Sequence, residues 1–294
     1  MIPQTEAARY ERSAKQAARL GLTLKLLVFA LLIGGAVSFM MPYWTMLVMA
    51  FKSDHEMVRT SVWAWPQEPT WENFQKVLTS PNVDFFLFFK NSLLVTLFSV
   101  VGVTGTSAAV AYAFARLRFA GRDRLFLLLL STMMLPAIVT LIPTFVMFAN
   151  LGWVNTFLPL TVPAFFGGGA FNIFLLRQFF LTLPRELDEA ALLDGASHWT
   201  IFSRVVLPLS KPALITVALF CFIGTWRDFF GPLIYLNDPD KQTLELGLQT
   251  FRALNDEKWT LIMSGAVLIS LPLVVIFFVG QRFFVKGIAM TGGK

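Results

Sequence analysis

The sequence contains few of the side chains from which reactive or metal-binding sites are built. Its 294 residues include one cysteine, two histidines and only 14% charged residues. Cys221 has no second cysteine with which to form a disulfide within the chain, and no cysteine cluster offers a metal site. A Ser–His–Asp site is equally unsupported. We therefore expect no metal, no redox chemistry and no enzymatic activity from this chain.

Charge is also scarce inside the long apolar runs. Ion-coupled transport usually needs carboxylates or basic groups within the membrane, so a secondary transporter that works alone is the less favoured alternative. The net charge of +6 comes from basic residues scattered over short loops, which does not favour nucleic-acid binding. The C-terminal GIAMTGGK has the wrong spacing for a phosphate-binding loop. No nucleotide or other cofactor is expected on the chain itself.

Apolar residues make up 56% of the sequence, and the mean hydropathy is +0.65. Uncharged runs of more than about 18 residues indicate helices that span a lipid bilayer. The uncharged run 125–176 is about twice that length and must cross twice, with a turn at 150–155. The chain is predicted to be an all-α membrane protein with six transmembrane helices. They are expected at residues 26–51, 91–115, 125–150, 156–180, 212–236 and 259–281.

The distribution of lysine and arginine predicts the orientation. Residues 1–25, the loop 116–124, the central loop 184–212 and residues 282–294 carry 15 of the 24 basic residues, which places them in the cytoplasm by the positive-inside rule. The two histidines then lie on opposite sides, which excludes a two-histidine metal site. The predicted organisation is a cytoplasmic segment 1–25, a transmembrane domain 26–285 and a cytoplasmic tail 286–294.

Residues 184–212 form a long segment that is too polar for lipid and lies away from the termini. Pro184 suits the first position of a helix, and acidic residues follow where they complement the helix dipole. Gly195 is predicted to break this helix. A second short helix is expected over 197–206, closed by Pro208. Two short helices joined by a bend, on a surface loop, form a shape suited to contact with another protein.

The same segment carries the spacing EAA–x3–G–x9–I–x–LP. Glu189, Ala190, Ala191, Gly195 and the Leu207–Pro208 pair stand at the required positions, with valine in place of isoleucine at residue 205. This pattern resembles the signature of the permease subunits of binding-protein-dependent ABC importers. The likeness extends over nearly the whole chain, and within the family it is greatest to the six-helix, maltose-type branch for carbohydrate uptake.

The resemblance implies that residues 184–208 contain the coupling helix, which seats in a cleft of a separate ATPase. Glu189 would anchor it, the alanines would allow close approach and Gly195 would set the bend. The implied partners are a second homologous permease (a heterodimer), two ATP-binding subunits that hold ATP-Mg, an extracytoplasmic solute-binding protein, a carbohydrate and the inner-membrane bilayer. The residues implied to contact the ATPase are Glu189, Ala190, Ala191, Asp194, Gly195, Leu207 and Pro208, with Thr291, Gly292 and Gly293 of the tail.

A translocation path is the least defined expectation. Its candidate residues are Asn172, Trp226, Arg227 and Asp228. The related pattern has asparagine where this chain has Arg227, which leaves open an anionic cargo such as a phosphorylated polyol or a uronate, or an amino acid. Interfacial residues that reach the outer headgroups are the alternative for Arg227 and Asp228. The glycines 167–169 are interpreted as close helix packing or a kink, with a broken helix at a substrate site as the alternative.

Overall fold

The computed structural model describes residues 4–81, 83–255 and 258–291. Every regular element within these ranges is helical, which confirms the predicted all-α class. The helices are α1 (Gln4–Ala50), α2 (Asp54–Arg59), α3 (Glu72–Leu78), α4 (Phe85–Arg116), α5 (Arg122–Ser131), η1 (Thr132–Met134), α6 (Ala137–Asn150), α7 (Leu158–Thr161), η2 (Val162–Phe165), α8 (Ala170–Thr182), α9 (Glu186–Leu193), α10 (His198–Ile201), η3 (Phe202–Val206), α11 (Leu207–Leu209), α12 (Lys211–Trp226), α13 (Phe230–Tyr235), η4 (Pro239–Lys241), α14 (Leu244–Leu254) and α15 (Trp259–Thr291).

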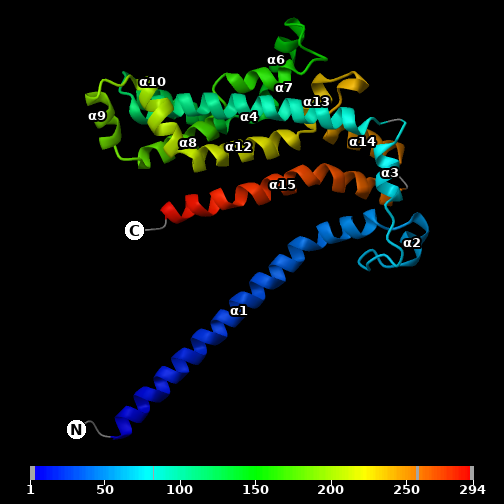
Figure 1. Cartoon of the computed structure of the whole chain (residues 1–294), viewed down its shortest axis with the longest axis horizontal. Coiled ribbons are helices and arrows are strands. Elements are labelled where there is room, and N and C mark those ends of the chain that lie inside the picture. Colours follow the sequence, from blue (N-terminus) through cyan, green and yellow to red (C-terminus); the bar gives the residue numbers. More distant parts are fainter. Residues whose placement is uncertain (1–3, 82, 256–257, 292–294) are drawn as a thin grey trace.

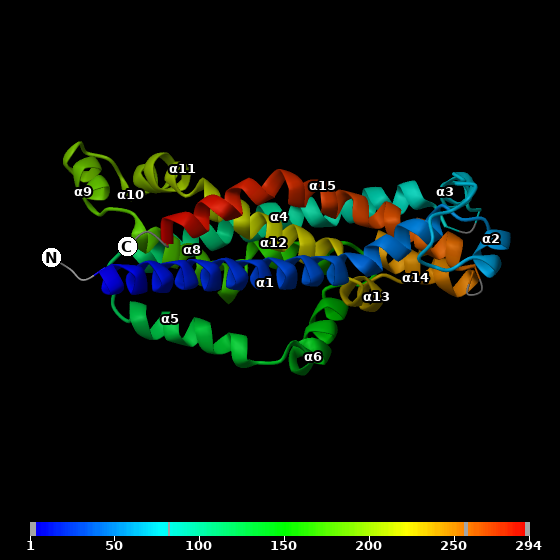
Figure 2. The same ribbon diagram turned by 90° about the horizontal axis from the view of Figure 1, so that it is seen from below.

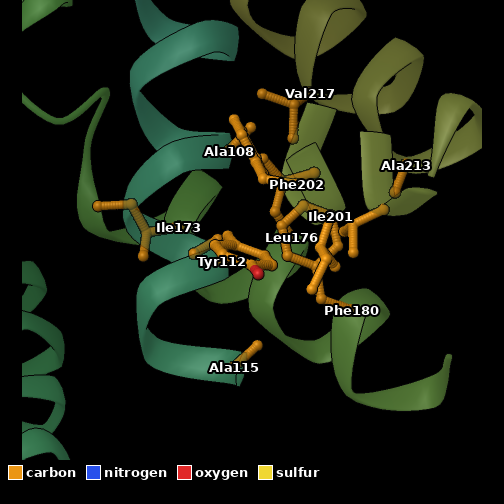
Figure 3. Close-up of a cluster of buried hydrophobic side chains, with 12 residues drawn as sticks. Ala108, Tyr112, Ala115, Ile173, Leu176, Phe180, Ile201, Phe202, Ala213 and Val217 are labelled. Atoms are coloured by element: carbon orange, nitrogen blue, oxygen red, sulfur yellow. The ribbon is translucent and has the colours of Figure 1, made fainter. Parts of the chain in front are cut away.

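A bundle of long helices forms the centre of the molecule. Helix α4 packs against α8 and α12, and α12 packs in turn against α15 (Figures 1 and 2). One apolar cluster joins α4, α8, α10, η3 and α12 near one end of the bundle, and Figure 3 shows Tyr112 and Phe202 within it. A second cluster surrounds Trp226 and joins α12 to α4, α14 and α15. These two clusters hold the bundle together along its length.

The long helix α1 leaves this bundle. It contacts α15 near its C-terminal end and diverges from the other helices toward its N-terminus (Figure 1). The predicted end at residue 51 is confirmed to within one residue. One helix, which starts at Gln4, continues unbroken from the predicted cytoplasmic segment 1–25 into the apolar run, and the cytoplasmic location of that segment stays a prediction. A helix needs no apolar residues to continue, so composition alone did not locate its start.

The third predicted span consists of two helices. Residues Arg122–Met134 and Ala137–Asn150 meet at 96°. Pro136 stands between them, and Leu135 before it has an extended backbone because a residue that precedes proline is disfavoured in the helical region. The chain has four helices long and apolar enough to span a bilayer, or six if each bent pair counts as one span, over the residues searched.

The fourth span is broken at its three glycines. Gly167, Gly168 and Gly169 all have positive φ, at 101°, 66° and 89°. A Cβ on Gly168 would overlap Ser107 Oγ of α4 and lie 2.5 Å from the carbonyl oxygen of Val103. The predicted kink with close packing is therefore confirmed, and a substrate site at the break stays a prediction.

The last two spans begin as expected but end differently. Helix α12 stops at Trp226, where the sequence predicted an interruption, and the chain resumes helical structure in α13. The predicted sixth span, 259–281, agrees with the apolar part of α15, and the helix itself continues beyond that span to Thr291. The segment 286–291, which we expected to be a tail, continues this helix.

The connecting segments gather at two opposite ends of the bundle. The N-terminal end of α1, the C-terminal end of α15 and helices α9 and α10 lie at one end, here called the coupling end (Figures 1 and 2). Helices α2, α3 and α14 lie at the other, the outer end. There the buried Lys52 donates to Thr60 Oγ1 and Ser61 O, and Asn73 Nδ2 donates to the carbonyls of Ala50 and Lys52. These bonds close the end of α1 against α3.

Candidate coupling surface

The first half of the candidate surface is α9. Its N-terminus lies one residue after Arg185, whose carbonyl accepts from the N–H groups of Asp188 and Glu189 at 3.0 and 3.1 Å. Pro184 therefore precedes the helix instead of occupying its first position. The acidic residues of the first turn lie where the helix dipole favours negative charge.

The bend after α9 is a Schellman motif. Ala196 N–H donates to Ala191 O at 2.9 Å and Gly195 N–H donates to Leu192 O at 3.0 Å. Gly195 has φ of 80°, a conformation that a side chain would strain. Asp194 is the C-cap residue. The predicted break at this glycine is confirmed.

The second half runs further than expected. Ser197 caps α10 by accepting from Thr200 N–H at 3.2 Å. The helix continues through a π turn and α11 to Leu209, so the prediction that Pro208 closes it is wrong. A proline in a regular α-helix clashes with the carbonyl four residues before it. Here the wider π turn, with Leu207 N–H bonded to Phe202 O, precedes the proline.

Helices α9 to α11 (Glu186–Leu209), here called the hook, have one face that is exposed. Glu189 and Ala190 are exposed, whereas Ala191 is half-buried against the apolar cluster of Figure 3. Leu193 is 90% exposed and Trp199 is 72% exposed, and Leu187 and Leu192 are exposed as well. None of these four residues belongs to the signature spacing. Their concentration at the end of a bundle, beyond the spanning helices, is a surface feature that marks interaction sites.

The opposite face of α9 is tied to α4 by an ion pair. Arg116 Nη1 lies 3.4 Å from Asp188 Oδ2, and Arg116 Nη2 donates to Leu183 O at 2.9 Å. Only 4% of the Arg116 side chain and 18% of the Asp188 side chain are exposed. Sequence reasoning missed this pair, because it assigned Arg116 to membrane orientation and Asp188 to the helix dipole. The residues are 72 positions apart, and no local pattern connects them.

The remaining ATPase-contact candidates divide into three groups. Leu207 is half-buried against the same apolar cluster, and Pro208 is exposed. Thr291 is the last residue of α15. Gly292 and Gly293 lie outside the described residues.

The four path candidates do not form one site. Trp226 is buried, donates from Nε1 to Ile269 O at 3.1 Å and stacks on Phe222, so its role is packing. Asn172 Nδ2 donates to Gly168 O at 2.8 Å and closes the glycine break. Arg227 is exposed. Asp228 accepts from Gly231 N–H at 3.1 Å and lines a cavity of about 250 Å³.

Comparison with known protein families identifies the family of this chain. The profile of the family described as the binding-protein-dependent transport system inner membrane component matches residues 85–290. This chain belongs to that family. Because the family consists of transport subunits of the inner membrane, the expectation that the permease is not an enzyme is confirmed.

Relatives and a solved structure cover most of the permease. The trehalose/maltose transport system permease protein MalG of Thermococcus litoralis is 30% identical over 86% of this chain and 91% of its own length. The galactooligosaccharides transport system permease protein GanQ of Bacillus subtilis is 33% identical over 83% of this chain and 87% of its own length. A chain from the crystal structure of a bacterial ABC transporter involved in the import of the acidic polysaccharide alginate superposes with a TM-score of 0.76 at 26% identity, covering 88% and 95%.

Proposed function

We propose that the permease is one membrane half of an ATP-driven carbohydrate importer, and that α9 is the helix through which a separate ATPase moves it. The observation that carries this proposal is the two-sided character of α9. Its exposed face carries Glu189 and Ala190, and its buried face is fixed to α4 by the ion pair between Asp188 and Arg116. A helix held in this way transmits displacement, because packed interfaces have discrete arrangements.

Each end of the bundle, and its uncovered side, is proposed to contact a different partner. The coupling end faces the cytoplasm and receives the ATPases, which hold ATP-Mg. Thr291, Gly292 and Gly293 remain the proposed contact of the C-terminal tail with them. A solute-binding protein docks on the outer end, at α2, α3 and α14. A second homologous permease completes the path, and the apolar surfaces of α1 and α6 that this chain leaves uncovered support that proposal.

The mechanism needs no reactive group in the permease. Closure of the ATPases displaces α9 together with the second half of the hook, since the turn at Gly195 is closed by two hydrogen bonds. The ion pair carries the displacement to α4, and the apolar cluster around Phe202 carries it to α8 and α12. The bundle then alternates between access from the two sides.

The cargo is a carbohydrate. The names of the relatives support this class, since they include permeases for trehalose/maltose and for galactooligosaccharides. Among the path candidates, Asp228 lines a cavity and Arg227 is exposed at the end of α12, so both are available to hydroxyl groups or waters.

An acidic carbohydrate is the second candidate cargo. The exposed guanidinium of Arg227 and the likeness to the alginate importer favour it. Replacing Arg227 by asparagine should then reduce uptake of an acidic oligosaccharide and leave uptake of a neutral one unchanged. Equal uptake of the acidic sugar by both proteins would eliminate this candidate.

The coupling role is tested by comparing Glu189→Ala with Glu186→Ala. Both residues are exposed on the first turns of α9, but only Glu189 belongs to the signature spacing. In this proposal Glu189 pairs with a basic residue of the ATPase, and docking buries the pair. Truncating one partner of a buried charge pair costs about 2–5 kcal/mol, so Glu189→Ala should weaken ATPase attachment on the order of 30-fold or more. The Glu186→Ala control should copurify with the ATPase as the unmodified permease does. Equal ATPase recovery and transport in both variants would contradict the proposal.

A further inference from the structure

Arginines from two distant parts of the sequence line one hollow at the coupling end. Arg118 comes from the segment that joins α4 to α5, Arg122 and Arg124 come from the first turn of α5, and Arg185 directly precedes α9. The hollow has a volume of about 510 Å³, and its lining is completed by Phe119, Gly121 and Asp123. The fold therefore concentrates four guanidinium groups at a place where the sequence shows only a basic loop.

The charges within this arginine hollow are not balanced. Asp123 accepts from Arg122 Nε at 3.0 Å. Among the described residues, no carboxylate lies within ion-pair distance of Arg118, Arg124 or Arg185. Four arginines and one aspartate leave a formal charge of +3. Such a site attracts anions, and arginine forks match the oxygens of a phosphate in particular.

An apolar surface begins where the hollow ends. Helix α5 starts at Arg122, and Leu125, Leu127 and Leu128 on its first turns are all exposed. Phe119 on the lining is exposed too. A free inorganic anion would use only the arginines, whereas an amphiphile with a phosphate headgroup would contact both surfaces at once.

We propose that the arginine hollow binds the headgroup of an anionic phospholipid, whose acyl chains lie along the exposed leucines of α5. Basic pockets beside membrane helices are suited to such headgroups. The site requires only that α5 enters the membrane at Arg122, and it is independent of the cargo. Because Arg185 directly precedes α9, a bound headgroup also joins the α4–α5 segment to the start of the coupling helix.

The test measures lipid occupancy on the purified importer complex by native mass spectrometry. The complex is titrated with phosphatidylglycerol or with zwitterionic phosphatidylcholine. The Arg118→Gln/Arg124→Gln variant is compared with Lys25→Gln/Lys211→Gln, which removes the same charge from exposed residues that do not line the hollow. We expect selective retention of phosphatidylglycerol, weakened about fivefold for each arginine removed and unchanged in the lysine control.

Each further arm has a defined outcome. Equal phosphatidylglycerol occupancy in the arginine and lysine variants would overturn the proposal. Displacement of the lipid by inorganic phosphate at the same concentration would show a free-anion site instead. Loss of the ATPase from the arginine variant with lipid occupancy unchanged would show that the hollow faces an acidic protein surface. Unchanged thermal unfolding of the variant verifies that its fold is intact.

Discussion

Helices α4 and α1 are both apolar enough to span a bilayer, yet the chain covers them very differently. Burial in α1 is found near its C-terminal end, at Val48 and Ala50. One third of the most apolar 18-residue stretch of α4 is buried within the chain, whereas none of the most apolar 18-residue stretch of α1 is buried. Helices α5 and α6 resemble α1 in this respect, since every residue from 131 to 140 is exposed. Figure 2 shows α5 and α6 set apart from the packed bundle.

The difference lies in small and polar residues and in what faces them. The buried face of α4 carries Ser99, Gly102 and Ser107, which let the broken fourth span approach closely. Helix α1 has Gly34 and Gly35, but a side chain on either would meet nothing within 4 Å. Hydropathy thus identifies which segments leave water. It does not identify which of them are covered by the chain itself and which require lipid or a second subunit.

The largest effect on the packed region is expected from Arg116→Leu. The change leaves Asp188 without its cation and Leu183 O without its donor in a site where the arginine is almost completely buried. Breaking a buried pair on one side costs about 3–5 kcal/mol. Chemical unfolding of the purified permease should show this loss. The double variant Arg116→Leu/Asp188→Leu should lose less than the sum of the single changes, and strict additivity would argue against a direct interaction.

A second contrast compares two glycines in the two regions. Gly168→Ala places a Cβ against Ser107 and Val103 and forces alanine to a φ of 66°, so we expect a loss of about 2–4 kcal/mol. Gly35→Ala adds the same methyl group to an open position inside α1, where it should be neutral or stabilise the helix by up to about 1 kcal/mol. Equal unfolding midpoints for the two variants would contradict the difference in packing.

The sequence predicted the parts of this fold that depend on composition and local spacing. Apolar runs located the spanning segments, and Gly195 marked the turn after α9 because few other residues adopt its conformation. The helix ends at Gln4 and Thr291 were not predictable from hydropathy, since helices extend past the apolar runs. Pro208 was misjudged because the π turn before it is set by the packing of Phe202 and Val206.

The sequence predicted the residues on the exposed face of α9, but not those on its buried face. The signature spacing identified Glu189 and Ala190, which the structure exposes at one end of the bundle. The inner face depends on Arg116, which is brought to Asp188 by the packing of α4 against α8. Long-range contacts of this kind leave no periodic trace in one sequence. The same reason applies to Arg185, which joins the hollow formed by residues of the α4–α5 connection and the first turn of α5.

A smaller effect is expected on the uncovered region. Phe39 of α1 is 81% exposed, so Phe39→Ala should change the unfolding free energy of the separated permease by less than about 0.5 kcal/mol. If a second permease covers α1, the same variant should reduce recovery of the paired complex by several-fold in pull-down experiments. The matched change Phe202→Ala, in the packed cluster, should destabilise the separated permease by about 3 kcal/mol. A reversed order would show that α1 is covered by the chain itself.

The smallest effect is expected at the outer end, from Glu245→Gln in α14. Burial raises the pKa of Glu245 above its ordinary value, and the nearby Arg227 partly offsets this shift. A carboxyl group with a raised pKa holds its proton more tightly in the folded state, so the fold loses stability as pH rises through the ordinary pKa toward the raised one.

The glutamine variant lacks this loss, and it should unfold at a slightly higher temperature than the unmodified permease at neutral pH but not at pH 4. The difference should stay below about 1 kcal/mol, because the half-buried side chain is screened by water. Glu68→Gln, on the exposed outer loop, removes the same charge without the burial and serves as the control. If Glu68→Gln raised the unfolding temperature at neutral pH as much as Glu245→Gln does, the effect would come from net charge and not from burial.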